Sequence, residues 1–143
     1  MRDCLSCLSL SGEKRISPGE IIYEGSYWVV EHAYPSSLLG WIVVVLKRHT
    51  DKLHELSAEE WNELGDINFK IINILHRLLE TEKEYSCCYA EGEGFKHIHF
   101  HIIPKGKDYL PENKGAKSFN YLKVNDEKSV SRDKIIELCR KLK

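Results

Sequence analysis

Lys96-His97-Ile98-His99-Phe100-His101-Ile102-Ile103-Pro104 carries the strongest structural signal in this sequence. Side chains of a β-strand point alternately to its two faces, so the three histidines share one face and the interleaved apolar residues share the other. A helix would scatter the three imidazoles over about 200° of arc. The pattern therefore predicts a strand with one buried face, ended by Pro104.

The face that carries the three histidines is the candidate functional surface. Imidazole titrates near neutral pH and binds metal ions. Three of these rings on one strand face therefore indicate a catalytic or metal-binding surface more than an ordinary solvent-exposed one. The alternative, a polar strand face that happens to be rich in histidine, is weaker because the alternation, the flanking aliphatic residues and the proline all agree.

The overall composition is that of one domain of ordinary globular character. The chain has 143 residues, 42% of them hydrophobic and 30% charged, which is enough to bury a core without cross-links. A formal net charge of −1 gives no overall attraction for nucleic acid or an anionic membrane, so we expect neither as a partner. We find no secretory signal and no apolar run approaching 18 residues. Five cysteines, two of them adjacent, argue against a disulfide framework and favour a reducing, cytoplasmic location.

Two of the cysteines form a Cys4-Leu5-Ser6-Cys7 motif near the start of the chain. A redox pair would follow a strand, and no strand is predicted before this motif. A zinc site would need two more ligands, for which His49 and His97 are the candidates. We favour zinc over free thiols, because exposed terminal thiols are prone to oxidation.

The remaining pattern predicts the secondary structure around the histidine strand. Residues 20–24 and 27–31 read as a hairpin, 40–46 as a central strand and 85–90 as a further strand. Ser57 and Glu60 form a capping box for a long amphipathic helix that reaches about residue 82. Residues 105–118 are polar and read as a solvated loop, with a lid as the alternative, and 119–124 as a short strand. Ser131 caps a C-terminal helix over 132–142.

The His-x-His-x-His motif followed by two apolar residues resembles the signature of the histidine triad superfamily. The segment from Gly40 to His49, an apolar strand followed by Lys47-Arg48-His49, also resembles the corresponding segment of this family. The resemblance covers roughly residues 4–104. It implies an α+β fold with an antiparallel sheet of about five strands, one long helix and a C-terminal helix. We therefore expect a single domain over residues 1–143, with its core at about 4–104, the polar loop at about 105–118 and the last helix at about 131–142. The resemblance also implies a homodimer.

The resemblance assigns roles to the histidines and cysteines. In the zinc-bearing branches of the superfamily, the positions matching Cys4, Cys7, His49 and His97 hold a structural Zn²⁺. The middle histidine of the motif, here His99, is the nucleophile. A neutral imidazole is a good nucleophile at pH 7, and attack on phosphorus would split one hard displacement into two easier ones. His101 could then hold a phosphoryl oxygen in the transition state and so belongs to both the catalytic and the nucleotide-binding residues.

Four positions of the expected nucleotide pocket depart from the family pattern. Trp41 stands where many members have a histidine, and could wall the base pocket or lie in the core. Glu93 and Gly94 stand where an amide and a hydroxyl usually contact phosphate, and the backbone N–H of Gly94 could still approach an anion. His32 falls at the ribose-hydroxyl acceptor, three residues before Pro35.

The expected function is that of a nucleotide hydrolase or nucleotidyl transferase. It would attack the α-phosphorus of a nucleoside phosphoramidate, a dinucleoside polyphosphate or a related nucleotide, through a covalent nucleotidyl-histidine. One alternative is a zinc-stabilised nucleotide-binding module with little turnover, suggested by Trp41 and Glu93. Another is a metalloenzyme in which the three histidines bind a catalytic metal, against which Cys4 and Cys7 argue because they offer a better closed site.

Overall fold

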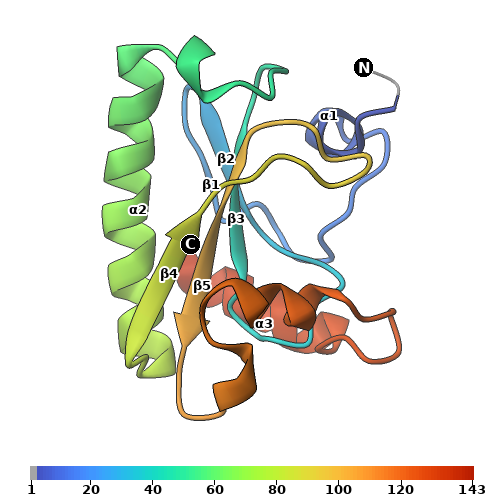
Figure 1. Cartoon of the computed structure of the whole chain (residues 1–143), viewed down its shortest axis with the longest axis vertical. Coiled ribbons are helices and arrows are strands. Elements are labelled where there is room, and N and C mark those ends of the chain that lie inside the picture. Colours follow the sequence, from blue (N-terminus) through green and yellow to red (C-terminus); the bar gives the residue numbers. More distant parts are fainter. Residues whose placement is uncertain (1–2) are drawn as a thin grey trace.

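The computed structural model describes residues 3–143 and is an α+β fold built on a five-stranded sheet (Figure 1). The strand order is β1-β2-β3-β5-β4, and every pair of neighbours is antiparallel. The strands are β1 (Tyr23–Glu24), β2 (Trp28–His32), β3 (Ile42–Leu46), β4 (Lys83–Cys87) and β5 (His99–Lys105). The predicted fold class, including the hairpin and the central strand, is confirmed.

Helices precede, interrupt and follow the sheet. They are α1 (Leu5–Ser11), α2 (Ala58–Leu79) and α3 (Arg132–Leu142), with short 3₁₀ helices η1 (Leu53–Glu55), η2 (Pro111–Asn113) and η3 (Gly115–Leu122). The capping box of Ser57 and Glu60 begins α2 as predicted, and Ser131 caps α3. Helix α2 ends before residue 82, because Glu80 takes a left-handed conformation with φ of 51°. Within residues 3–143, none of the helices combines the length and the apolar character that a membrane crossing requires.

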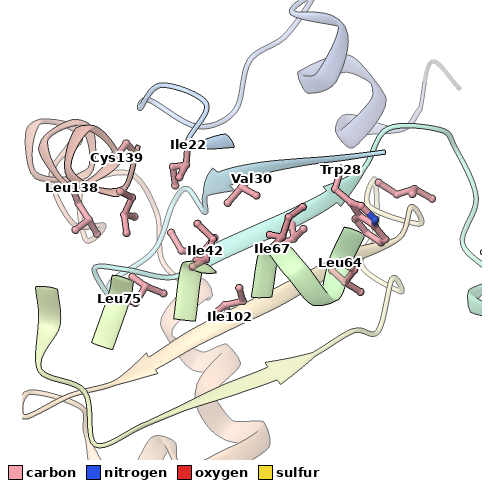
Figure 2. Close-up of a cluster of buried hydrophobic side chains, with 14 of the residues drawn as sticks. Ile22, Trp28, Val30, Ile42, Leu64, Ile67, Leu75, Ile102, Leu138 and Cys139 are labelled. Carbon is pink, nitrogen blue, oxygen red and sulfur yellow. The ribbon is translucent and has the colours of Figure 1, made fainter. Parts of the chain in front are cut away.

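The main core lies between α2 and one face of the sheet. Leu64, Ile67 and Leu75 point from α2 toward strand residues that include Ile42 and Ile102 (Figure 2). Helix α3 closes the same core with Ile135, Leu138 and Cys139. Each such side chain contributes roughly 1.5–3 kcal/mol when it leaves water. Trp61 and Leu78, which share the helical spacing, are each 41% exposed, so the buried stripe of α2 is narrower than the pattern predicted.

The histidine strand begins later and runs further than predicted. His97 lies before β5, in a turn where its N–H donates to the carbonyl of Phe95. Pro104 lies inside β5 and pairs with Glu84. Strand β3 begins at Ile42, opposite Ile102, so Pro104 lies beyond the end of β3. On that side of β5 Pro104 has no strand partner, and its missing N–H is therefore tolerated. The prediction that Pro104 ends the strand was wrong.

The segment after β5 packs part of its side chains on the histidine face of the sheet. Tyr109 and Tyr121 are each 6% exposed, and Ser118 is fully buried. The tyrosines form a second apolar cluster with Trp41 and Ile103. Most residues of 105–118 are exposed, as predicted for a polar loop, but Tyr109 and Ser118 within it are buried. The prediction of a strand over 119–124 was wrong, because η3 covers Gly115–Leu122.

Two smaller differences concern the ends of elements. Helix α1 was not predicted, and it is only seven residues long. Strand β4 lies at Lys83–Cys87, earlier than the predicted 85–90, because its register with β5 starts at the pair Lys83 and Lys105. Ala90 has a positive φ of 53°, which an extended strand cannot contain.

Candidate active site and metal centre

His99 and His101 lie on the sheet face opposite α2. Register places His101 beside Val43 and Val43 beside Glu31, so these three side chains form a row across β5, β3 and β2. The rings of His99 and His101 have their centroids 4.9 Å apart. Both line a cavity of about 230 Å³ whose other walls come from α1, the segment after it, β2, β3 and Phe95.

The geometry of His99 leaves one ring nitrogen free. Its Nδ1 lies 2.7 Å from the carbonyl oxygen of His97, and since a carbonyl only accepts, Nδ1 carries the proton. Nε2 therefore holds a lone pair, and none of the residues 3–143 bonds to it. Burial lowers the pKa of His99, which favours the neutral ring. The ring thus directs an unprotonated nitrogen to the cavity, which is compatible with the predicted role of His99 as nucleophile.

His101 is held in the opposite tautomer by Trp41. The indole N–H of Trp41 donates to His101 Nδ1 at 3.0 Å, so the proton of the neutral imidazole lies on Nε2. Burial, together with the charge of His99, lowers the pKa of His101 to about 3. The site therefore pairs an unprotonated nitrogen on His99 with an N–H donor on His101.

Trp41 does not line the cavity. It is fully buried, with its ring packed edge to face against Phe119 at 5.3 Å. The predicted contact between Trp41 and a nucleotide base is therefore wrong, and the indole acts through His101. Strand alternation carried this signal, because Trp41 shares a face with Val43 and hence with His101.

His32 cannot accept a hydrogen bond from ribose. Its Nδ1 donates to the carbonyl of Ala33 at 2.7 Å, and its Nε2 accepts from the N–H of Gly40 at 2.9 Å. The side chain is 1% exposed, and burial lowers its pKa to about 4. Alternation along β2 turns Val30 to the core and Glu31 to the cavity, and His32, at the end of β2, also borders the cavity with both ring nitrogens already bonded. The predicted role of His32 as a ribose acceptor therefore does not fit its hydrogen bonds, and the sequence pattern did not single out Glu31, which also lines the cavity.

Glu93 and Gly94 lie outside the cavity. They border a separate hollow together with Cys4, His49 and Lys96. The carbonyl of Gly94 accepts the N–H of Leu5 at 2.7 Å, and a side chain at Gly94, where φ is +82°, would meet Leu5 at 2.9 Å. This turn docks α1 beside the cysteines, and the predicted contacts of Glu93 and Gly94 with a nucleotide stay a prediction.

The four predicted metal ligands come together. The ligand atoms of Cys4, Cys7, His49 and His97 all lie within 4.8 Å of one another. His97 Nδ1 is 3.5 Å from each of the two sulfurs and 3.2 Å from His49 Nδ1. A tetrahedral Zn²⁺ with ordinary bond lengths separates sulfur from nitrogen by roughly 3.5 Å and two nitrogens by roughly 3.3 Å.

The tautomer of His97 also suits a metal ligand. Its Nε2 donates to the carbonyl of Leu46 at 2.6 Å, which leaves Nδ1 unprotonated and aimed at the cluster. Two thiolates and two imidazoles are the donor set of a closed structural zinc site. The residues therefore fit zinc. Because His97 belongs to this cluster, while Nδ1 of His99 and of His101 is already bonded, the three motif histidines do not converge on one metal, and that alternative is contradicted.

The antiparallel sheet, the His-x-His-x-His strand beside a cavity and the adjoining Cys–His cluster are the features expected of a histidine triad protein. The family model described as "Scavenger mRNA decapping enzyme C-term binding" matches residues 6–116. The chain belongs to this family, within the histidine triad superfamily, and the resemblance noted in the sequence is confirmed. Members of the superfamily are generally nucleotide hydrolases or transferases. No curated protein sequence matches the chain.

Solved structures share the fold at low sequence identity. A histidine triad nucleotide-binding protein from Sulfolobus tokodaii has a TM-score of 0.70 at 19% identity, covering 97% of this chain and 89% of that one. The diadenosine triphosphate hydrolase of Plasmodium falciparum has a TM-score of 0.64 at 17% identity, covering 86% and 73%. A zinc-bound histidine triad family protein from Mycobacterium smegmatis has a TM-score of 0.59 at 18% identity, covering 94% of each chain.

Proposed function

We propose that this protein is a nucleotide hydrolase or nucleotidyl transferase whose nucleophile is His99. The substrate would be a nucleoside phosphoramidate, a dinucleoside polyphosphate or a related nucleotide. The observation that carries the proposal is the tautomer of His99, because the bond from Nδ1 to the His97 carbonyl leaves the Nε2 lone pair in the cavity. The similarity to a protein described as a diadenosine triphosphate hydrolase supports the same class of substrate.

The reaction would run in two displacements. His99 Nε2 forms a bond to the α-phosphorus while the bond from phosphorus to the leaving amine or phosphate breaks, and the leaving group takes the electron pair. Water or another acceptor then forms the new bond to phosphorus, gives up a proton, and the bond to His99 breaks. Splitting the transfer in this way replaces one difficult step with two easier ones.

His101 would stabilise the charge that develops in both steps. Its Nε2–H points a fixed donor at the reacting phosphoryl group, because the indole of Trp41 holds the other nitrogen. A preorganised donor in a site shielded from water costs no reorganisation when the charge appears. Cys4, Cys7, His49 and His97 would hold Zn²⁺, which supplies structural anchoring at the start of this strand.

The rival proposal, a nucleotide-binding module without turnover, rested on Trp41 and Glu93. Trp41 maintains the hydrogen-bond network of His101, and Glu93 lies at the hollow beside the cysteines. The departure at Trp41 therefore leaves the reacting site with a bonded His101, and Glu93 places no carboxylate in the cavity. We therefore favour the enzyme.

Rapid-quench analysis with an α-³²P-labelled nucleoside phosphoramidate or dinucleoside polyphosphate tests the proposal. We expect label on His99 in an acid-labile, base-stable bond, and net retention of configuration at phosphorus. Nucleotide binding without any turnover of these substrates would support the binding module. Inversion at phosphorus would show that water attacks directly.

We further propose a homodimer in a reducing, cytoplasmic compartment. Strand β4 forms an edge of the sheet, and Phe69 on α2 is 71% exposed, so an apolar surface is open to a second copy. Light scattering on the purified protein tests the dimer, since a monomeric mass across micromolar concentrations would contradict it. Imaging of the tagged chain tests the compartment.

A further inference from the structure

The cavity contains one carboxylate that neither the metal cluster nor the reaction uses. Glu31 is 6% exposed and lines the cavity together with His99 and His101. Of the described residues that form these walls, Glu31 is the only acid, and no lysine or arginine is among them. A buried charge of this kind is costly unless it is bonded, so its partners matter.

Only one oxygen of this carboxylate is occupied. Arg15 donates through Nη1 to Oε1 of Glu31 and through Nη2 to the carbonyl of Gly19 at 3.0 Å, which fixes the ion pair. No residue from 3 to 143 donates to Oε2 of Glu31. Oε2 is also absent from the fully sealed unpartnered atoms, which in that range comprise only Oδ1 of Asn68. Oε2 therefore faces the open space of the cavity as an unused acceptor.

The position of Glu31 places it at the end of the cavity away from the reacting phosphorus. It lies two strands from His101 along one row, which separates their Cα atoms by about 10 Å. In a 5′-nucleotide the edge of the base lies farthest from the phosphorus, and the ribose lies between. A nucleotide with its phosphorus at His99 would thus present its base to Glu31.

The hydroxyls of Ser6, Ser9 and Ser17, which also line the cavity, can each rotate to donate or accept, so they do not by themselves select one base. Val43, Val45 and Phe95 offer apolar surface, which any base face can contact. Glu31 does distinguish bases, because an ionised carboxylate can only accept hydrogen bonds. Guanine places two donors side by side, N1–H and the N2 amino group. Adenine and cytosine place a lone pair beside their amino group, and uracil flanks its single N–H with carbonyls.

We propose that Glu31 is a specificity-determining residue that selects guanine nucleotides at this site. The inference rests on the proposed function for the location of the phosphorus, and it adds the identity of the base. The free Oε2 and the second lone pair of Oε1 accept from N1–H and N2–H of guanine, and Arg15 holds the carboxylate in place. The hydroxyl of Ser6, which also lines the cavity, is a rotatable donor for a base acceptor.

Calorimetric titration of the zinc-loaded full-length protein with mononucleotides tests this inference. We expect wild-type protein to bind guanosine 5′-monophosphate about 10- to 100-fold more tightly than adenosine 5′-monophosphate, as expected for hydrogen bonds to a charged acceptor. Inosine 5′-monophosphate, which lacks the N2 amino group, should fall between them. Glu31→Gln should reduce the guanine preference to within about threefold.

Two controls separate recognition from stability. Glu24→Gln removes an ion-paired carboxylate on the adjacent strand, outside the cavity, and should leave the preference unchanged. Arg15→Ala removes the partner of Glu31 but keeps the carboxylate. It should lower stability and weaken both nucleotides while guanine remains preferred. If Glu31→Gln does not fold, the inference is still tested by whether the wild type and Arg15→Ala both bind guanosine 5′-monophosphate more tightly than adenosine 5′-monophosphate.

Several outcomes would overturn the inference. Equal wild-type affinity for the two mononucleotides, or an unchanged preference in Glu31→Gln, would show that Glu31 does not read the base. A loss of affinity for 2′-deoxyguanosine 5′-monophosphate equal to the effect of Glu31→Gln would assign the carboxylate to the ribose instead. If the wild type binds no nucleotide at all, the proposed function fails together with this inference. Nucleotide binding without preference would leave the proposed function standing.

Discussion

Replacing Trp41 by phenylalanine tests whether the indole sets the tautomer of His101. Trp41→Phe removes the N–H that donates to His101 Nδ1 at 3.0 Å and keeps an aromatic ring against Phe119. Without that donor, Nδ1 of His101 is a buried acceptor left unpartnered, and the ring can move its proton from Nε2 to Nδ1. Leaving such a group unpartnered costs about 1–3 kcal/mol.

The expected effect is on kcat more than on KM. If about 1–2 kcal/mol of transition-state stabilisation is lost, kcat falls roughly 5- to 30-fold. KM should change little, because His101 donates most strongly when charge develops on the phosphoryl group. Steady-state kinetics with a nucleoside phosphoramidate, well below the melting temperature, measures both constants. Nitrogen NMR should show His101 protonated at Nε2 in the wild type and partly at Nδ1 in the variant.

Trp28→Phe is the matched control. Trp28 is also fully buried, and its indole donates to the carbonyl of Glu60 at 2.8 Å, but it lies on the α2 side of the sheet. Both variants should lose about 1–3 kcal/mol of stability through lost packing and a lost hydrogen bond. Only Trp41→Phe should lose kcat. Equal kcat in the two variants, or a loss confined to KM, would refute the role assigned to Trp41.

Three further predictions concern the nucleophile, the metal and the pH dependence of folding. His99→Asn should abolish turnover in a radiolabelled assay while calorimetry still detects nucleotide binding, and His101→Asn should cost less; wild-type turnover in His99→Asn would exclude the covalent mechanism. Cys4→Ser should lower zinc content below one per chain by elemental analysis and reduce thermal stability, because metal binding adds to folding free energy; a fully stable, zinc-free wild type would contradict the site. The hydrogen bond from Arg48, with help from Ser57, lowers the pKa of Glu60 to about 2. Because the pKa of Glu60 is lower in the folded than in the unfolded protein, its carboxylate stabilises the fold above the unfolded value near 4.5, and this stabilisation is lost as the pH falls toward 2. Urea denaturation should therefore show that the free energy of unfolding of the wild type falls by about 1–3 kcal/mol more than that of Glu60→Gln between pH 5 and 2. Equal losses in the two proteins would refute this prediction.

Local patterns predicted the parts of the fold whose causes lie within a few neighbouring residues. The capping box of Ser57 and Glu60 bonds the free backbone N–H groups at the start of its own helix. The alternation of polar and apolar residues around His99 predicts a strand with one buried face without knowledge of its neighbours. The metal ligands were also predicted, because a Cys-x-x-Cys pair and two histidines at strand ends have few other uses.

The errors came from features that depend on distant partners. Residues 105–118 read as wholly solvated because their many charges hide Tyr109, and residues 119–124 read as a strand. The surface that buries Tyr109 and Tyr121 includes Trp41 and Ile103, which are distant in the sequence. His32 was chosen by its spacing from Pro35, but that spacing does not reveal that both of its ring nitrogens are already bonded. Glu31 gave no signal of its own, since a lone acid in a strand does not reveal whether it faces solvent or a cavity.

Helix α1 takes part in two binding sites at once. Cys7 lies within it and Cys4 immediately precedes it, while Ser6, Ser9 and Leu10 form part of the cavity wall. The metal and the nucleotide would thus order the same seven residues, so the two equilibria are thermodynamically linked. Linkage is reciprocal: whatever factor zinc adds to nucleotide affinity, nucleotide must add to zinc affinity. A chelator should therefore strip zinc from the nucleotide-saturated protein less readily than from the nucleotide-free protein.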